Sequence, residues 1–297
     1  YKSYYPAADD DNNKRRMRKQ TKYNIKIDEI PQEIQINEYF ENFLKQCQEF
    51  IQKIRHGNEE EDNNNNNNNN VQKYKRRIII GVVGGAGAGK SSFCSIIEKH
   101  LNNQNNNNEE TNTSNIAITI GMDGYHFTNE YLNSNFIPGT KDTLLRTIKG
   151  DLLSIDVKSI YNDLSKLKMN NEKANKIFFP VYDRNLHDPV QNKICVDKHH
   201  EIIFFEGLHL LTNDNSYWDQ IKALLNGLII LNTPIDICKE RVIVRRVTQG
   251  KTKEASTKHW EKNDLHIHTR INNAIQTLNT NNLLQNIPTL LLYPCVY

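Results

Sequence analysis

The sequence predicts an α/β fold with three α/β/α layers, in which helices cover both faces of a parallel β-sheet. Two observations predict it. Residues 76–297 alternate short apolar segments, rich in β-branched residues, with longer segments of helical periodicity. A glycine-rich run at 84–91 joins the first of these strands to the first helix. Because parallel strands need a crossover connection, this alternation indicates a parallel sheet.

The expected elements follow one another along residues 76–297. The run at 78–83 is uniformly apolar, as expected of a strand covered on both faces. The segment 156–168 is periodic, and Ser154 or Asp156 could cap its N-terminus. Pro234 near the start of 234–247 is typical of a first helical turn. We expect strands at 78–83, 116–122, 177–182, 201–205, 227–231 and 290–293, and helices at 91–101, 156–168 and 234–247.

Composition excludes several classes of protein. Of the 297 residues, 37% are hydrophobic, which is below the usual fraction for a globular protein. Asn-rich runs at 63–70 and 102–115 account for the difference. The remainder can build a core, which excludes collagen, a coiled-coil array and a wholly disordered chain. With 38 basic and 35 acidic residues, the net charge of +3 does not favour nucleic acid or a membrane as a partner. No apolar stretch approaches the roughly 18 residues of a spanning helix.

The five cysteines show neither a CxxC motif nor regular spacing. We therefore expect reduced thiols in an intracellular, cytoplasmic protein, rather than a disulfide framework or a zinc site. The sequence begins with Tyr1, not Met, so a preceding segment or targeting peptide stays open. A homo-oligomer also stays open.

The first 75 residues divide into three predicted segments. Residues 1–27 form a disordered tail in which an acidic cluster precedes a basic one, either a solvated tail or a nuclear address or nucleic-acid arm. Residues 28–57 form an amphipathic helix that ends at Gly57. This helix could pack on its own chain or dock a partner. Residues 58–75 form an Asn-rich linker, and 76–297 form the main domain, with a low-complexity insertion at 102–115.

The glycine-rich run matches the pattern G-x-x-x-x-G-K-[ST] of a P-loop. Glycines let backbone N–H groups surround phosphate oxygens, and the following helix offers its positive N-terminus. We expect the lysine to reach the β- and γ-phosphates and the first serine to bind Mg²⁺. A plain small-residue turn is the alternative, but the strand before and the helix after favour nucleotide binding. The predicted ATP-binding residues are Gly84, Gly85, Ala86, Gly87, Ala88, Gly89, Lys90, Ser91 and Ser92.

Other motifs narrow the kind of P-loop protein. The chain lacks the N-K-x-D guanine motif of a GTPase and the LSGGQ-like signature of a transporter ATPase. It does contain M-D-G-Y-H-F at 122–127 and F-F-E-G at 204–207, each at the end of a predicted strand. Ligands of open parallel sheets lie beyond the carboxyl ends of the strands. Asp123 and Glu206 are therefore expected to point towards the P-loop.

These motifs resemble the phosphoribulokinase/uridine kinase family of P-loop kinases, and within it most nearly the branch of fructose-transport-system-like and yeast ATP-dependent kinases. The resemblance covers roughly 76–297 and includes F-P-V-Y-D at 179–183, H-D-P-V at 187–190 and the stretch 250–264. It implies a nucleoside-monophosphate-kinase-like fold with a five-stranded parallel core and a mobile lid. It also implies ATP-dependent phosphorylation of a small-molecule hydroxyl.

Two carboxylates are candidates for the chemistry. Asp123 stands where the family places its catalytic aspartate, and it could orient the acceptor hydroxyl and take its proton. The alternative is an aspartate that caps a turn. Glu206 ends an apolar strand, where an isolated charge would be costly, so Mg²⁺ or the acceptor would compensate. A salt bridge to an arginine of the lid is the alternative.

The predicted acceptor site draws on two motifs. Tyr182 and His187 fit the Y-D-x-x-x-H spacing that the resemblance places around the acceptor, and Tyr125 and His126 adjoin Asp123. His126 is equally a structural histidine. Arg184 departs from the family, because uridine kinases carry an aromatic residue there. Its guanidinium suits an anionic or polar acceptor at least as well as a pyrimidine.

A basic segment is expected to close over the triphosphate. Arg241 and Arg245 share one face of their helix, and we favour them over Arg246 as catalytic cations beside Lys90 and Asp123. Residues 248–258 are predicted to form the mobile lid. Asn263 and Asp264 match the pair that follows the lid in the family.

Two functions of different class fit the sequence. The first is an ATP-dependent kinase acting on a hydroxyl of a nucleoside, a sugar or a pantothenate-like acceptor, with Mg²⁺ as cofactor. The second is a nucleotide-binding regulatory or partner-binding module with weak or no kinase activity. Asp123, Tyr182, His187 and the lid cations exceed what a pure switch needs, which favours the kinase.

Overall fold

The structure is a computed structural model, and it describes residues 32–65, 77–108, 115–169, 176–212, 217–276 and 287–293. The predicted tail at 1–27 and much of the Asn-rich linker and insertion lie outside these residues. The chain divides into two compact units, Tyr1–Gln46 and Cys47–Tyr297. The fold described next is that of the second unit.

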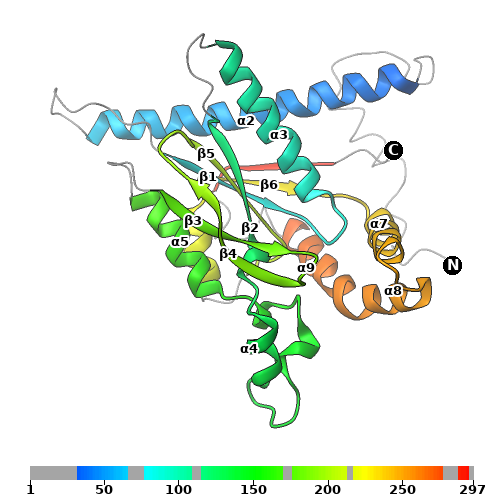
Figure 1. Cartoon of the computed structure of the whole chain (residues 1–297). Coiled ribbons are helices and arrows are strands. Elements are labelled where there is room, and N and C mark those ends of the chain that lie inside the picture. Colours follow the sequence, from blue (N-terminus) through cyan, green and yellow to red (C-terminus); the bar gives the residue numbers. More distant parts are fainter. Residues whose placement is uncertain are drawn as a thin grey trace. The chain divides into compact units, whose positions relative to one another are not determined.

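A five-stranded parallel sheet forms the centre of this unit (Figure 1). Its strands lie in the order β2-β5-β1-β6-β7. Every pairing between neighbours is parallel, so each connection crosses over the sheet. The fold class predicted from the alternating pattern is confirmed. The bounds are β1 Ile78–Val83, β2 Ala117–Gly121, β5 Ile202–Gly207, β6 Gly227–Leu231 and β7 Thr289–Leu292.

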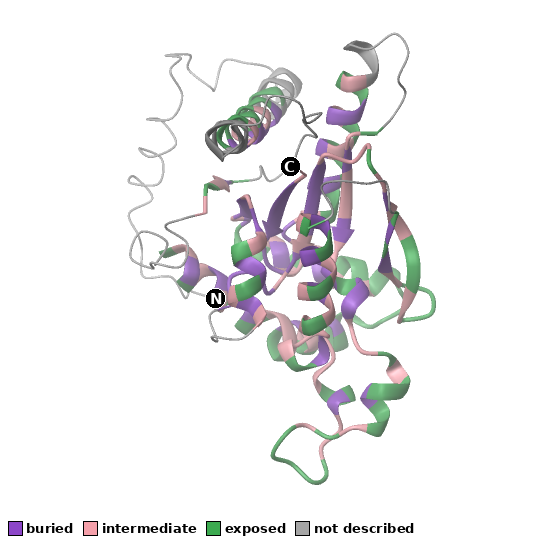
Figure 2. Cartoon of the chain, turned by 90° about the vertical axis from the view of Figure 1, so that its left-hand side faces the viewer, coloured by how far each residue is buried: buried purple, intermediate pink, exposed green. Residues whose placement is uncertain are grey.

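The sheet strands are apolar because they are buried on both faces. All six residues of β1 and all five of β6 are buried, and the strands form the interior in Figure 2. Such strands lose the alternation of half-exposed sheets and appear as continuous runs of Ile, Leu and Val. This is why 78–83 and 227–231 were predictable to the residue.

Helices flank the sheet and lie in the connections between its strands (Figure 1). The helix α5 matches its prediction within one residue, and Asp156, not Ser154, caps it, because its carboxylate accepts the Ser159 N–H at 3.0 Å. The bounds are α3 Lys90–Asn108, α4 Asn129–Ser134, α5 Val157–Met169, α6 Tyr217–Leu224, α7 Ile235–Thr248, α8 Lys253–His259 and α9 Leu265–Gln276. Short helical turns are η2 Met122–Tyr125, η3 Leu145–Ile148, η4 Leu152–Ser154 and η5 Trp260–Asp264.

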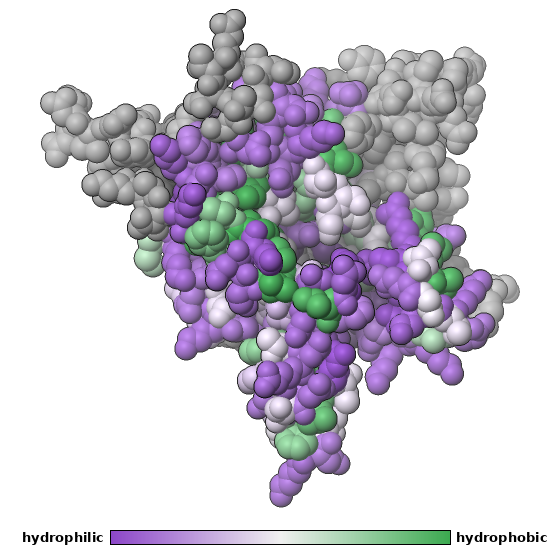
Figure 3. Space-filling view, viewed as in Figure 1, coloured by the Kyte–Doolittle hydropathy of each residue, from purple (hydrophilic) through white to green (hydrophobic). Residues whose placement is uncertain are grey.

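The predicted strand at 177–182 exists but lies outside the central sheet. It is β3, Ile177–Asp183, and it pairs antiparallel with β4, Asp188–Val196, as a separate hairpin. The strand β4 was not predicted, because a proline and a polar run interrupt its pattern. The hairpin buries Phe179 completely and leaves Phe178 48% exposed. In Figure 3 apolar residues gather over this hairpin on an otherwise mostly hydrophilic face.

The helix predicted at 28–57 is α2, Gln32–Asn65, and its predicted end at Gly57 is wrong. Gly57 lacks the positive φ of a C-terminal cap, so the helix continues through it. From Cys47 onwards the helix packs on the sheet of its own chain. Ile54 and Phe50 lie so close to Gly227 that a Cβ there would meet both, and Arg55 forms an ion pair with Glu201.

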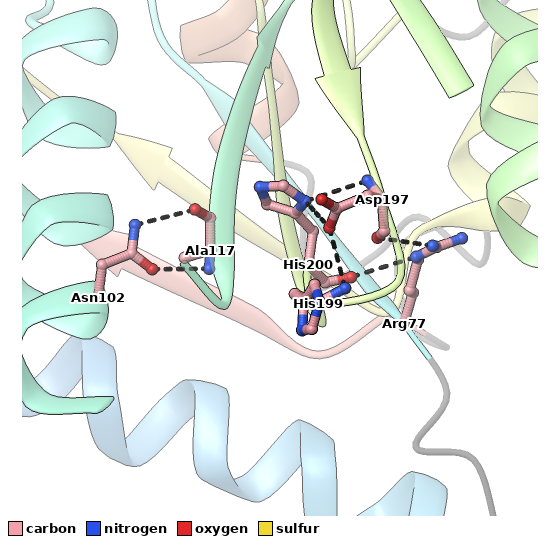
Figure 4. Close-up of polar contacts among 6 residues, drawn as sticks. All are labelled: Arg77, Asn102, Ala117, Asp197, His199 and His200. Carbon is pink, nitrogen blue, oxygen red and sulfur yellow. Dashed lines mark hydrogen bonds and ion pairs between the residues drawn. The ribbon is translucent and has the colours of Figure 1, made fainter. Parts of the chain in front are cut away.

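The helix α3 runs seven residues beyond its predicted end, into the Asn-rich stretch. Asn102, predicted to begin a low-complexity insertion, is buried instead. Its side chain pairs with both backbone polar groups of Ala117, at 2.9 and 3.0 Å (Figure 4). Arg77 donates to the carbonyls of His200 and Asp197 nearby. These contacts fix the amino ends of β1, β2 and β5, opposite the ends that carry the predicted site.

Candidate active site

The P-loop bends sharply between β1 and α3. Gly87 and Gly89 have φ values of 79° and 93°, which side chains rarely adopt. A Cβ on Gly87 would lie 2.4 Å from the Cys238 carbonyl, and one on Gly85 would lie 1.9 Å from the His268 ring. The loop is therefore cradled by α7 and α9 and admits only glycine at these points.

Lys90 folds back along this loop. Its Nζ donates to the carbonyls of Gly84 at 2.9 Å and Gly85 at 3.1 Å. Burial lowers the Lys90 pKa, while the nearby Glu206 and Asp123 carboxylates oppose that shift. The Lys90 Nζ thus lies against the loop, at the position where a triphosphate would lie on a P-loop.

Two oxygen-bearing side chains meet beside Lys90. The Ser91 hydroxyl lies 2.9 and 3.0 Å from the two Glu206 oxygens. Burial raises the Glu206 pKa, and the Ser91 hydrogen bond opposes this shift. A hydroxyl and a half-buried carboxylate are the ligand types that Mg²⁺ prefers, so these residues fit the ion expected with ATP.

Asp123 lies across from Glu206 at the same end of the sheet. It is the second residue of the turn η2, which directly follows β2, and β2 pairs with β5 so that Gly121 is in register with Glu206. Asp123 is exposed and interacts electrostatically with Lys90 and Glu206. The carboxylate is thus on the P-loop side, as the strand-end argument predicted.

The predicted acceptor residues split into two groups. Two of them lie next to Asp123: the His126 and Tyr182 rings lie 5.3 Å apart, and His126 Nδ1 is 2.8 Å from the Asp123 carbonyl. Tyr125 instead points inward: it is 4% exposed and its hydroxyl donates to Asp163 of α5. The structure therefore gives Tyr125 a packing role, in place of the predicted substrate contact.

The turn between β3 and β4 carries two further predicted residues, Arg184 and His187, both exposed. The backbone carbonyl of His187 accepts from Asn129 at 2.9 Å and from Lys149 Nζ at 2.8 Å. The Lys149 Nζ also lies 5.1 Å from the centre of the Tyr182 ring. Sequence reasoning missed Lys149, because it lies in an irregular segment outside every motif.

The predicted lid cations come from α7. Arg241 Nη1 approaches the Gly87 carbonyl at 3.4 Å, which places it over the P-loop. Burial lowers the Arg245 pKa, and the neighbouring Arg184 adds to this effect, whereas Asp264 and Asp123 oppose it. The predicted lid segment 248–258 forms a turn and most of α8, a helix that the sequence analysis did not predict.

Two further titratable groups lie near this region, the partly buried Asp264 and the buried His268. Burial raises the Asp264 pKa to about 6, although Arg245 and Arg246 lower it. His268 Nε2 lies 2.9 Å from the Ala86 carbonyl, and burial lowers the His268 pKa. No sequence pattern points to His268, since only the fold brings α9 against the P-loop.

The chain belongs to the phosphoribulokinase/uridine kinase family, whose model matches residues 79–290. It is 29% identical over 187 residues to the ATP-dependent kinase YFH7 of Vanderwaltozyma polyspora, covering 51% of each chain. It is 27% identical over 146 residues to the protein YggC of Escherichia coli, covering 49% of this chain and 55% of that one. The chain thus spans about half the length of these curated relatives.

Solved structures share the fold. YFH7 from Saccharomyces cerevisiae aligns with a TM-score of 0.59 at 18% identity, over 73% of this chain and 93% of that one. A protein provisionally called a fructose transport system kinase, from Silicibacter sp. TM1040, aligns at 0.58 and 21%, over 76% and 93%. The predicted family and its P-loop kinase fold are therefore confirmed. Within the described residues, no helix is both long and apolar enough to cross a membrane.

Proposed function

We propose that this protein is an ATP-dependent kinase that transfers the γ-phosphate of ATP to a hydroxyl of a small molecule. One observation carries the proposal: Asp123 lies at the same sheet end as Lys90 and the Ser91–Glu206 pair, and the His126 and Tyr182 rings lie close to it. A nucleotide-binding switch needs neither a carboxylate beside the phosphate site nor polar rings such as His126 and Tyr182 next to that carboxylate. A kinase needs such a carboxylate there.

The residues take distinct roles in this reaction. Backbone N–H groups of the P-loop bind the phosphates, with Lys90 at the β- and γ-phosphates and Ser92 beside Ser91 at the helix N-terminus. Ser91 and Glu206 would hold Mg²⁺, which, when bound, supplies positive charge to the phosphate oxygens. Arg241 and Arg245 add positive charge from the lid side.

Asp123 orients the acceptor hydroxyl in line with the γ-phosphorus. The acceptor oxygen forms a bond to that phosphorus while the bond to the β,γ-bridging oxygen breaks, and ADP leaves. The hydroxyl proton passes to the Asp123 carboxylate. His126 and Tyr182 flank the acceptor, and His187 and Arg184 lie at the edge of its site.

ATP consumption with and without a panel of hydroxyl compounds tests the proposal. We expect one class of acceptor to stimulate ADP formation strongly and the Asp123→Ala variant to lose that stimulation. Lys90→Ala should abolish transfer while it melts with the wild-type profile, because its charge serves the ligand and not the core. Hydrolysis that ignores every acceptor and survives Asp123→Ala would instead favour the regulatory module.

A further inference from the structure

Basic side chains from separate elements converge on the acceptor side of the site. Lys149 follows η3, Arg146 lies within η3, and Arg184 lies in the turn after β3. Lys149 Nζ is fixed by its hydrogen bonds to Asn129 Oδ1 at 2.7 Å and to the His187 carbonyl, which places it against the Tyr182 ring. The fold thus directs positive charge to the face of Tyr182.

Both arginines belong to the same group. Arg146 interacts electrostatically with Tyr182 and Lys149, and Arg184 interacts with Tyr182, Glu206 and Arg245. Arg184 therefore lies within electrostatic range of both the Tyr182 hydroxyl and the Glu206 carboxylate of the reaction centre. Arg146 faces the same ring from the η3 segment.

The two guanidinium groups lack a carboxylate of their own. Among the described residues, neither the Arg146 nor the Arg184 side chain forms a hydrogen bond or an ion pair, and both residues are exposed. The acidic groups nearby are held elsewhere: Glu206 accepts from Ser91, and Asp188 accepts the Asn129 N–H at 2.8 Å. Asp188 and Glu206 lie within electrostatic range of these cations but, in the part of the chain that the structure describes, form no ion pair with either arginine, so an anion bound between the arginines would relieve their mutual repulsion.

We propose that the acceptor carries an anionic group, a carboxylate or a phosphate monoester, which Arg184 and Arg146 bind beside Lys149 while its hydroxyl faces Asp123. Guanidinium groups suit both anions, because their N–H donors match two oxygens at once. This inference rests on the proposed kinase function. It makes neutral nucleosides and sugars poor acceptors.

Matched pairs of acceptors test the inference on the full chain. Glycerate against glycerol tests a carboxylate, and glucose 6-phosphate against glucose tests a phosphate monoester, each by ADP formation and product detection. We expect at least one anion to exceed its neutral partner by about 10- to 100-fold in kcat/KM, the range of one or two charge-assisted hydrogen bonds. Equal or better use of the neutral partners would overturn the inference and leave the kinase function standing. ATP consumption that no acceptor changes would overturn the proposed function, and this inference with it.

Charge-removing variants locate the anion. Arg184→Gln and Arg146→Gln should each lower the anion-to-neutral ratio of kcat/KM by about tenfold or more. Arg184→Lys should recover part of the loss, since it restores the charge but not the paired donors. Lys158→Gln is the matched control, because Lys158 is exposed on α5. Circular dichroism verifies folding. A ratio unchanged in both arginine variants would contradict the assignment of the site.

Discussion

At the scale of single residues, the site depends on interactions between one cation, Lys90, and two carboxylates, Asp123 and Glu206. Lys90, Asp123 and Glu206 interact with one another, and burial works against the charged forms of Lys90 and Glu206. Both carboxylates stabilise the charged form of Lys90, and Lys90 stabilises that of Glu206, whereas Asp123 opposes it, so the loss of one group changes the others. Asp123 is the exposed member of the set, so it can be changed with the least disturbance to packing.

Asp123→Asn should lower acceptor phosphorylation by about 10²- to 10⁴-fold, the usual contribution of a general base. The amide keeps the shape of the side chain but cannot take the hydroxyl proton. ATP affinity, measured by calorimetry, should change far less than turnover. The matched control is Asp142→Asn, since Asp142 is exposed and bonded only to its neighbour Thr143 in the described chain. Full turnover by Asp123→Asn would remove Asp123 from the chemistry.

Asp264 predicts a pH dependence of stability. Its pKa of about 6 in the folded chain exceeds the ordinary value of 3.8, so the folded state holds this proton more tightly than the unfolded state. Proton binding by Asp264 therefore adds to the free energy of unfolding. This contribution, roughly 3 kcal/mol at most, is fully present below about pH 4 and is lost as the pH rises through about 6. Asp264→Asn should flatten that part of the curve. Denaturant unfolding of both proteins between pH 4 and 7 measures the difference, and parallel curves would contradict the burial of this carboxyl.

At the scale of elements, the P-loop, α7 and α9 form one packed unit. Gly87 rests against the Cys238 carbonyl of α7, and Gly85 rests against the His268 ring of α9. The shape of the phosphate cradle therefore depends on helices far along the sequence. Glycine is needed at these positions because the backbone approaches its neighbours too closely for a Cβ and, at Gly87, because φ is positive.

Gly85→Ala should lose nucleotide affinity, because the new Cβ would lie 1.9 Å from the His268 ring and push the loop or α9 away. His268→Ala removes that obstacle, so the double variant should bind ATP more tightly than Gly85→Ala alone. Such non-additivity is expected of residues in contact. Gly57→Ala is the control, since nothing lies within 4 Å of its Cβ position. Strictly additive losses would show that the two residues do not meet.

Strands that are buried along their whole length were predictable from sequence, and strands that are partly exposed were harder to predict. The strand β1 is buried throughout, and its apolar run gave its bounds. The hairpin partner β4 was missed, because its residues from Gln191 to Lys193 are exposed and Pro189 interrupts the pattern. Motif spacing placed Asp123 and Glu206, but it also assigned Tyr125 to the substrate. Sequence adjacency cannot reveal that a turn directs this side chain towards Asp163.

At the scale of the whole molecule, the sheet presents two ends with different tasks. The carboxyl ends of β1, β2 and β5 carry Lys90, Asp123 and Glu206, as expected for an open parallel sheet. The amino ends are fixed by Asn102, Arg77 and the second half of α2. Stability and chemistry can therefore be separated by mutation.

Ile54→Ala tests that separation. Ile54 is 6% exposed and touches Gly227 of β6, so its truncation should leave a cavity and cost about 2–4 kcal/mol of unfolding free energy. The KM for ATP should stay at the wild-type value well below the melting temperature, because β6 meets this helix at the end remote from the P-loop. Gln52→Ala, at an exposed position of the same helix, is the control. Unchanged stability in Ile54→Ala would show that α2 does not pack on the sheet in solution, whereas a raised KM would show that the two ends of the sheet are coupled.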